Sequence, residues 1–226
     1  MKAIFVLMLL VATIGYSQSG ATPKKVFFMY FMKGEGQRPE DKGELEKMQA
    51  AHLANLTEQF KNQNILVAGP LQDPTKERRG IVVLHVENED GVAALFKNDP
   101  YVKNNIMGIS LMEWKVSPDA FKTRVGDPNS IVPYRLAIFT PGKSLRPVNA
   151  RIMKEHQDYM DSLKQTHKLG IRGEVNSAKK IREIAIFEGE DTKGIEAALS
   201  QDPLVRAALL EVEIIPLWMM KGTFGQ

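Results

Sequence analysis

The sequence has no cysteine among its 226 residues. Disulfide bonds, thiolate catalysis and attachment of a lipid to cysteine are therefore excluded. Three other signatures are also absent: a glycine-rich phosphate loop, a nucleophile elbow, and histidine and acidic residues clustered at metal-ligand spacing. The sequence thus predicts an activity that needs neither a metal nor an organic cofactor.

Neither sign of charge dominates the chain, because 30 Lys and Arg residues oppose 27 Asp and Glu residues and the two kinds are interspersed. A protein that binds nucleic acid concentrates positive charge in a patch or stripe. The composition therefore gives no support for a nucleic-acid partner. With 43% hydrophobic and 25% charged residues, it is typical of one or two globular domains.

The first residues predict export. Lys2 supplies a positive charge, residues 3–14 form an apolar run, and the small residues Gly15 and Ser17 suit cleavage between Ser17 and Gln18. The run is too short to cross about 30 Å of hydrocarbon as a helix. We therefore expect residues 1–17 to be a signal peptide and the mature chain to be periplasmic or secreted, without membrane attachment. An uncleaved anchor or a misplaced start codon is the competing interpretation.

Four landmarks occur twice in the chain. From the histidine to the glycine, the Asp-Pro pair and the tryptophan, the spacings are 17, 47 and 62 residues in the first copy and 17, 46 and 62 in the second. This period is longer than the units of a solenoid and indicates a duplicated domain. The landmarks are His52, Gly69, Asp99-Pro100 and Trp114, then His156, Gly173, Asp202-Pro203 and Trp218.

Each copy has hydrophobic periodicity in the order β-α-β-β-α-β. The expected elements are strand 26–32, helix 40–62, strands 65–68 and 81–86, helix 88–98 and strand 106–116, then strand 134–139, helix 148–168, strands 171–175 and 182–187, helix 192–200 and strand 211–218. This order is typical of a ferredoxin-like unit, an antiparallel sheet with both helices on one face. Stacking the two bare faces predicts an α+β fold in which two repeats form an intrachain pseudo-dimeric α+β barrel.

The predicted domain boundaries follow from these elements. Repeat 1 covers residues 24–116, a linker that contains proline and glycine covers 117–133, and repeat 2 covers 134–220. Because one chain would complete the barrel, we expect a monomer with a pseudo-dimeric core or a weak homo-oligomer.

His52 and His156 are the candidate bases. His52 lies four residues after Met48 and four before Leu56, on the apolar stripe of its predicted helix, and His156 is placed similarly. Partial desolvation would lower the pKa of such an imidazole and favour the neutral form that accepts a proton. The competing interpretation is structural, with the ring packed against the sheet and bonded to a backbone carbonyl.

Asp99 and Asp202 each precede a proline, which is the expected start of a helical turn capped by aspartate. The alternative is that each carboxylate orients the histidine of its own copy, as in other catalytic dyads. Gly69 ends a strand where backbone can approach a ligand closely, whereas the corresponding pair in the second copy is Gly173-Glu174. Trp114 either packs in the core or stacks on a substrate.

Several motifs resemble the YCII-related family. They are "HLANLTEQFKNQNILVAGPLQD" from His52 to Asp73, "GIVVLHVENEDGVAALFKNDPYV" from Gly80 to Val102, and "MEWKV". The second copy is similar to a divergent member that keeps "KEH", "LGIRGE" and "QDPLV". The resemblance implies the dimeric α+β barrel fold and identifies His52 and Asp99 as the signature pair of the family. Relatives of this fold include isomerases, lyases and dehalogenating enzymes that act on small, often aromatic or lactone-like molecules.

Two functions are favoured by these residues over a third, a purely structural interaction protein, which only the predicted open sheet faces support. The first is a cofactor-independent enzyme of isomerase or lyase type, in which a His-Asp dyad transfers a proton on a small organic molecule. The second is a non-catalytic periplasmic module that binds a small ligand or responds to stress. The candidate catalytic residues are His52, Asp99, His156 and Asp202, and the candidate substrate-binding residues are Gly69, Pro70 and Trp114.

Overall fold

The computed structural model describes residues 23–122, 130–176 and 181–224, and the order of its elements repeats in two halves. The predicted signal peptide and residues 123–129 of the predicted linker lie outside the described residues. The first half contains β1 (Lys25–Lys33), α1 (Lys42–Lys61), β2 (Ile65–Pro70), β3 (Arg78–Val86), α2 (Glu89–Phe96), α3 (Pro100–Lys103) and β4 (Met107–Trp114). The second half contains β5 (Ile131–Pro141), α4 (Ala150–Thr166), β6 (Leu169–Asn176), β7 (Glu183–Glu188), α5 (Thr192–Leu199), α6 (Pro203–Arg206) and β8 (Leu210–Met220).

All twelve predicted strands and helices are found, and α3 and α6 are additional one-turn helices. Both additional helices begin at an Asp-Pro pair, whose aspartate accepts hydrogen bonds from the first backbone N–H groups of the turn. α1 begins in a related way, since Asp41 accepts from the N–H of Glu44 at 2.8 Å. Local capping by Asp41, Asp99 and Asp202 therefore fixes where α1, α3 and α6 begin.

The eight strands form an antiparallel sheet in the order β2-β3-β1-β4-β6-β7-β5-β8. β4 pairs with β6 at Trp114 and Val175, which joins the first half to the second. At the other end of the order, an isolated bridge between Leu71 and Leu217 brings the β2 end of the first half against β8. The chain thus has an α+β fold in which strand pairing joins the two halves at β4–β6 and again beside β2 and β8.

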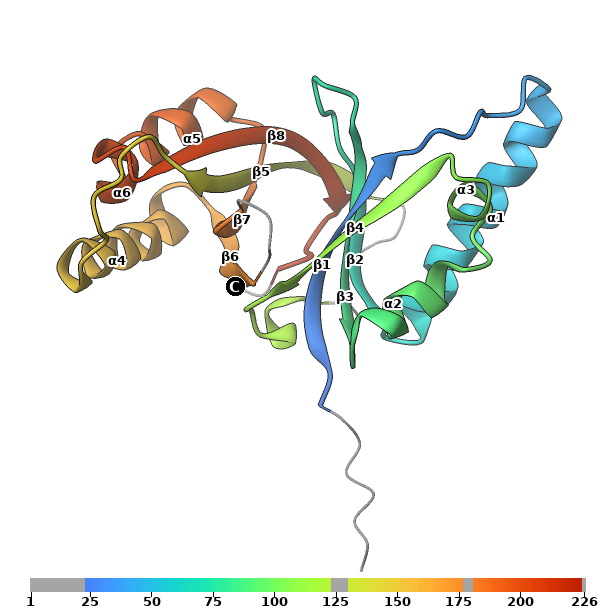
Figure 1. Cartoon of the computed structure of the whole chain (residues 1–226), viewed down its shortest axis with the longest axis horizontal. Coiled ribbons are helices and arrows are strands. Elements are labelled where there is room, and N and C mark those ends of the chain that lie inside the picture. The colour runs from blue at the N-terminus through green and yellow to red at the C-terminus, as the bar shows by residue number, and fades with distance from the viewer. Residues whose placement is uncertain (1–22, 123–129, 177–180, 225–226) are drawn as a thin grey trace, which may run out of the picture.

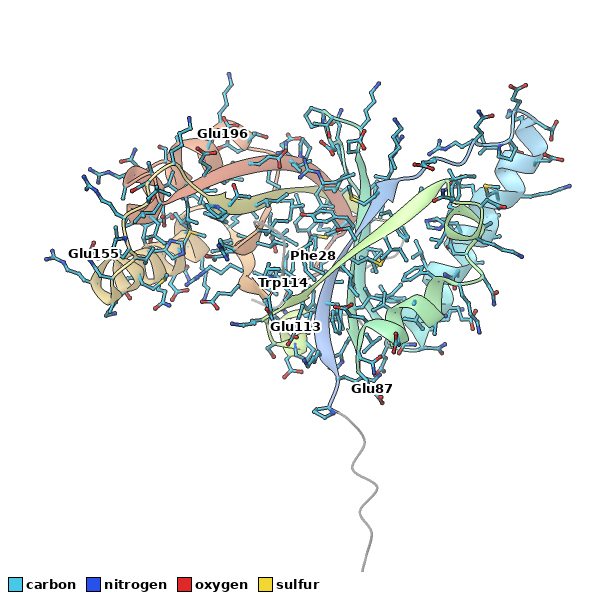
Figure 2. All side chains as sticks on the ribbon, viewed as in Figure 1. Phe28, Glu87, Glu113, Trp114, Glu155 and Glu196 are labelled. Atoms are coloured by element: carbon cyan, nitrogen blue, oxygen red, sulfur yellow. The ribbon has the colours of Figure 1, made fainter. Side chains whose placement is uncertain are left out.

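The helices lie on the outer sides of this arrangement and the strands lie between them (Figure 1). One apolar cluster fills the space between the strands of the two halves, and a separate cluster lies between the strands and helices of each half. Phe28 and Trp114 lie in the central region, whereas Glu155 and Glu196 project from the outer helices (Figure 2). Within the described residues, no helix is both long and apolar enough to span a bilayer.

Candidate active site

His52 and Asp99 meet in the first half, on the helical side of the sheet. The Nδ1 atom of His52, on α1, lies 2.7 Å from Oδ2 of Asp99, which immediately precedes α3. Both residues are buried, and Asp99 has no exposed surface. Residues 47 positions apart in the sequence are therefore brought into direct contact, as the dyad hypothesis requires.

Asp99 is a helix cap and a partner of histidine at the same time. Its Oδ1 accepts from the backbone N–H groups of Tyr101 at 3.1 Å and Val102 at 3.4 Å, while Oδ2 bonds His52. Burial raises the pKa of Asp99, but the hydrogen bonds and charge of His52 and the two backbone donors outweigh burial and lower it. The two interpretations of the Asp-Pro pair are therefore compatible, and Asp99 is an ionised acceptor.

The ring of His52 contacts two aromatic side chains and borders a cavity. Phe31 and Tyr101 lie edge to face with it, at centroid distances of 5.3 Å and 5.2 Å. Among the described residues, none forms a hydrogen bond with Nε2 of His52. The ring borders a cavity of about 340 Å³, and its other lining residues are Phe31, Gln49, Leu53, Leu56, Ala68, Gly69, Pro70, Arg79, Gly80, Ile81, Met107 and Ile131.

Gly69 and Pro70 both line this cavity, but a contact with the other half explains the glycine. A Cβ atom on Gly69 would lie 1.9 Å from the carbonyl oxygen of Trp218, so glycine is needed for β2 to approach β8. Gly173 has the same role at the other contact between the halves, where a Cβ would lie 2.6 Å from the carbonyl oxygen of Lys115. The close approach predicted at Gly69 is therefore made by backbone of the second half, and Gly69 borders the cavity as well.

Trp114 does not line the cavity, contrary to its prediction as a substrate-binding residue. Its side chain is 1% exposed, lies in the central cluster against Phe28 and Phe121, and donates from Nε1 to the carbonyl of Gly173 at 3.0 Å. The alternation of β4 explains this position, since Met112 and Trp114 face the other half whereas Ile109 and Leu111 face the helices. Trp114 therefore packs between the halves.

The second half contains a matching pair. Nδ1 of His156, on α4, lies 2.6 Å from Oδ2 of Asp202, and Asp202 also accepts from the N–H groups of Leu204 and Val205. Phe139 lies at the edge of the ring, at a centroid distance of 6.3 Å. The four predicted catalytic side chains are thus brought together as two separate pairs, one in each half.

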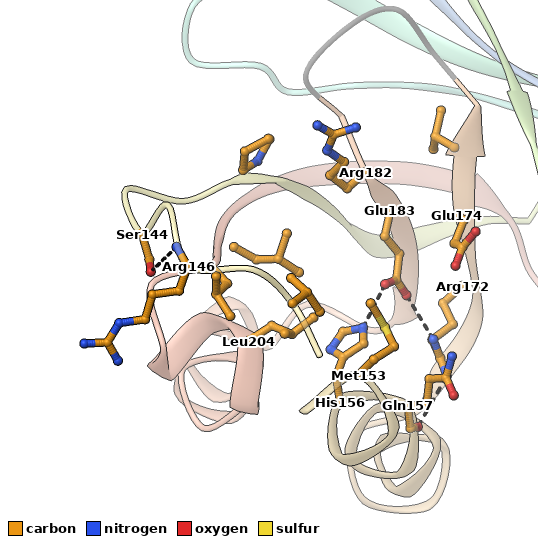
Figure 3. Close-up of a pocket in the computed structure, with 15 residues that line it drawn as sticks. Ser144, Arg146, Met153, His156, Gln157, Arg172, Glu174, Arg182, Glu183 and Leu204 are labelled. Carbon is orange, nitrogen blue, oxygen red and sulfur yellow. Dashed lines mark hydrogen bonds and ion pairs between the residues drawn. The ribbon is translucent and has the colours of Figure 1, made fainter. Parts of the chain in front are cut away.

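Glu183 distinguishes the second pair from the first. Its Oε2 lies 3.0 Å from Nε2 of His156, and its Oε1 accepts from Arg172 at 3.2 Å (Figure 3). Burial alone would lower the pKa of His156, but hydrogen bonds to Asp202 and Glu183 outweigh burial and raise it to about 9. The prediction of a lowered pKa and a neutral ring was therefore wrong for His156, which is an imidazolium at neutral pH.

Strand pairing identifies the residues that correspond between the two halves. Phe31 pairs with Gly80 and Phe139 pairs with Glu183, so glycine stands in the first half where the second half has glutamate. By the same register, Ala68 pairs with Val82 and Arg172 with Ala185, so alanine takes the place of arginine. The first half therefore lacks both members of the Glu183–Arg172 pair, and its histidine nitrogen stays open to a cavity.

Glu183 and Arg172 were not predicted as site residues. The sequence did contain a signal, because the otherwise apolar segment 183–187 begins with an acidic residue at the position that holds glycine in segment 80–84.

Within the described residues, no group of histidine, aspartate and glutamate has an arrangement that could hold a metal ion. The first pair presents an imidazole that is oriented by a carboxylate and borders a cavity.

One family model matches the part of the chain that contains the first pair. The family model of the YCII-related domain matches residues 27–115, which are the first half of the chain. No curated protein matches the sequence.

Solved structures resemble both halves together. A candidate chlorite dismutase, TA0507, has a TM-score of 0.60 at 10% identity and covers 86% of this chain and 94% of its own. A mutant chlorite dismutase from Candidatus Nitrospira defluvii has a TM-score of 0.57 at 16% identity, with coverages of 88% and 93%. A haem-binding protein from Thermus thermophilus has a TM-score of 0.54 at 9% identity, with coverages of 87% and 91%. At these identities the likeness establishes a shared fold, the chlorite dismutase-like α+β architecture.

Proposed function

We propose that this YCII-related domain is the catalytic half of a cofactor-independent enzyme of isomerase or lyase type. His52 transfers a proton, through Nε2, to and from a small organic molecule bound in the adjoining cavity. One observation carries the proposal: Nδ1 of His52 is bonded to Asp99 while Nε2 borders a cavity of about 340 Å³. A volume near the lower end of ligand pockets, which span about 300–1,000 Å³, suits a molecule of one ring or a short chain.

Asp99 is a positioning residue for this chemistry. Because an ionised carboxylate can only accept hydrogen bonds, Nδ1 of His52 must be the donor. The lone pair of the neutral ring is then on Nε2, on the side of the cavity. When Nε2 takes a proton, the charge of Asp99 stabilises the imidazolium, and the same nitrogen returns the proton to another atom of the substrate.

The second half has a structural function in this proposal. We interpret the two halves as a tandem duplication that forms an intrachain pseudo-dimeric barrel, with domains at residues 24–116 and 134–220. His156 and Asp202 then stabilise the divergent repeat, because Glu183 already occupies the nitrogen that a substrate would have to reach. This revises the expectation that both pairs are catalytic.

Export to the periplasm or beyond also remains a proposal, which rests on the N-terminal sequence alone.

Haem is a group to consider, since one protein of similar fold is described as haem-binding. Haem iron is commonly held by one nitrogen of a proximal histidine. Both nitrogens of His156 are bonded to carboxylates, at 2.6 Å and 3.0 Å, so neither is free to bind iron. His156 therefore does not fit an axial ligand for haem.

A substrate screen tests the proposal. The mature chain is incubated with lactones, enol acids and halogenated phenols, and His52→Gln is compared with His85→Gln, a histidine of β3 outside the cavity lining. Removal of a general base lowers turnover by about 100- to 10,000-fold, so we expect that loss for His52→Gln and none for His85→Gln. Turnover that survives in His52→Gln would show that His52 is not the base.

A further inference from the structure

Arg79 is the one fixed charge among the described residues that line the first cavity. Among the described residues that line the cavity, none is acidic, and Arg79 alone is permanently ionised. The walls are otherwise mostly apolar, and two exposed hydrophobic side chains belong to them, Leu53 at 51% and Ile131 at 53% exposure. A ligand that matches this lining has a hydrocarbon body and one negative group.

A β-bulge places Arg79 in the cavity wall. On β1, Phe31 pairs with Gly80 and the next residue, Met32, pairs with Arg78, so Arg79 has no partner on that strand. Its carbonyl is nevertheless held, because it accepts from the N–H of Leu71 at 3.1 Å. Bulges commonly occur beside active sites, where the extra residue redirects a side chain. The backbone at Arg79 is thus fixed on one side while the bulge sets the direction of its side chain.

The guanidinium of Arg79 lacks the partners that its neighbour has. Arg78 forms ion pairs with Asp73 at 2.9 Å and with Glu213 at 2.6 Å. Arg79 is half-buried, and no hydrogen bond or ion pair joins its side chain to any other described residue. A partly desolvated charge without a partner is unfavourable, and an anion bound beside it would offset that cost through charge-assisted hydrogen bonds.

The second half supplies a natural control. Arg182 precedes Glu183 as Arg79 precedes Gly80, and its carbonyl accepts from Val175 at 2.9 Å, as that of Arg79 does from Leu71. In Figure 3, Arg182 points away from His156 and Glu183. Its pocket also contains two carboxylates of its own, Glu174 and Glu183. Only the first cavity therefore combines an open histidine nitrogen, an unpaired arginine and no acidic residue in its described lining.

We propose that Arg79 is the anion-binding residue of the first cavity, and that the cavity takes small monocarboxylates with an apolar body. The planar fork of arginine matches the two oxygens of a carboxylate, which would orient the hydrocarbon part of the molecule along the apolar wall. The inference rests on the proposed function, because it names the substrate class of the same site.

Binding of benzoate and benzamide tests the inference without any turnover. Both have one aromatic ring and similar shape, and only benzoate is charged. Affinities are measured by calorimetry on the whole mature chain carrying His52→Gln, so that a failure of the proton-transfer proposal does not affect the result. We expect benzoate to bind at least about 10-fold more tightly than benzamide, the scale of one charged hydrogen bond. Arg79→Met should abolish this preference, Arg79→Lys should restore part of it, and Arg182→Met should leave it unchanged.

Two results would overturn the inference. The first is that benzoate fails to bind or binds no better than benzamide. This comparison uses the protein with Arg79 intact. The second is that Arg79→Met, shown to be folded by circular dichroism, keeps the preference for benzoate. Either result would leave the role of His52 in turnover to be judged separately from the substrate screen.

Discussion

In the first half, one ring nitrogen of His52 is hydrogen-bonded to Asp99 and the other faces a cavity. In the second half, both ring nitrogens of His156 are bonded to carboxylates. The helix, the capping aspartate and the aromatic neighbour are alike in the two halves. What differs most directly at the second ring nitrogen is one strand position, which is Gly80 in one half and Glu183 in the other, together with Ala68 in place of the Arg172 that pairs with Glu183.

The difference shows that a histidine–aspartate pair does not define an active site by itself. The pair orients an imidazole, but the residue opposite the second nitrogen decides whether a substrate can reach it. With Glu183 and its partner Arg172 in place, the ring is a buried cation that holds α4 to the sheet. Without them, the same ring is available for proton transfer.

Gly80→Glu should cause the largest change, because it gives the first half the carboxylate of the second. We expect turnover to fall at least about 100-fold, as Nε2 of His52 gains a fixed partner. A Cβ at this position lies 2.9 Å from the carbonyl of Gly69, so some strain is expected. Gly80→Ala carries the same Cβ without the carboxylate and should keep most of the turnover. Equal losses in the two variants would mean that strain, rather than the carboxylate, closes the site.

Glu183→Gln should make the second pair more like the first. Loss of the charge beside Nε2 should lower the pKa of His156 from about 9, and the free energy of unfolding at pH 7 should fall by about 1–3 kcal/mol. NMR titration of the ring and denaturant unfolding measure the two effects. Glu174→Gln is the matched control, because Glu174 forms an exposed ion pair with Lys115 and should change stability by less than about 1 kcal/mol. An unchanged pKa for His156 would contradict the assigned contact.

Alkaline pH should weaken the second half selectively. The folded-state pKa of His156, about 9, exceeds its ordinary value of 6.5, so protonation stabilises the fold fully below about pH 6.5. This contribution is lost as the pH rises through about 9, and it amounts to about 3 kcal/mol at most. Unfolding curves at about pH 6.5, 8 and 9.5 should therefore show a decline that is smaller in His156→Gln. Parallel declines in the two proteins would exclude His156 as the cause.

Trp114→Phe should have the smallest effect, and only on stability. The variant loses the hydrogen bond from Nε1 to Gly173 between the halves, which is worth about 1 kcal/mol. Because Trp114 is not among the residues lining the cavity, the KM of any substrate should not change. A raised KM together with unchanged stability would show that Trp114 takes part in substrate binding.

The sequence was sufficient to predict the α+β fold and to name the residues of both pairs, but it left open whether each histidine meets its aspartate. Hydrophobic periodicity located the strands and main helices, because each element buries one face or both. The matching separations of His52 from Asp99 and of His156 from Asp202 made a contact in each copy a reasonable hypothesis. The cap and the dyad are compatible because the two oxygens of one carboxylate bond different partners, Oδ1 the backbone of α3 and Oδ2 the ring of His52; sequence spacing does not show that both partners lie within reach.

Residue spacing could not predict the partners across the sheet. Glu183 meets His156 because β7 pairs with β5 in one register and α4 packs on that face, and neither relation is local in the sequence. The surroundings of Gly69 and Trp114 were missed for the same reason, since each is determined by the other half of the chain. The sequence position of a glycine indicates a close approach but not what approaches.

Turnover in two matched variants, His52→Gln and His156→Gln, tests the central difference between the halves most directly. Each replaces a buried imidazole bonded to an aspartate that caps a one-turn helix. The account predicts that His52→Gln loses about 100-fold or more of kcat, whereas a folded His156→Gln keeps kcat and loses only stability. Equal losses of kcat in the two variants, or a loss confined to His156→Gln, would contradict it.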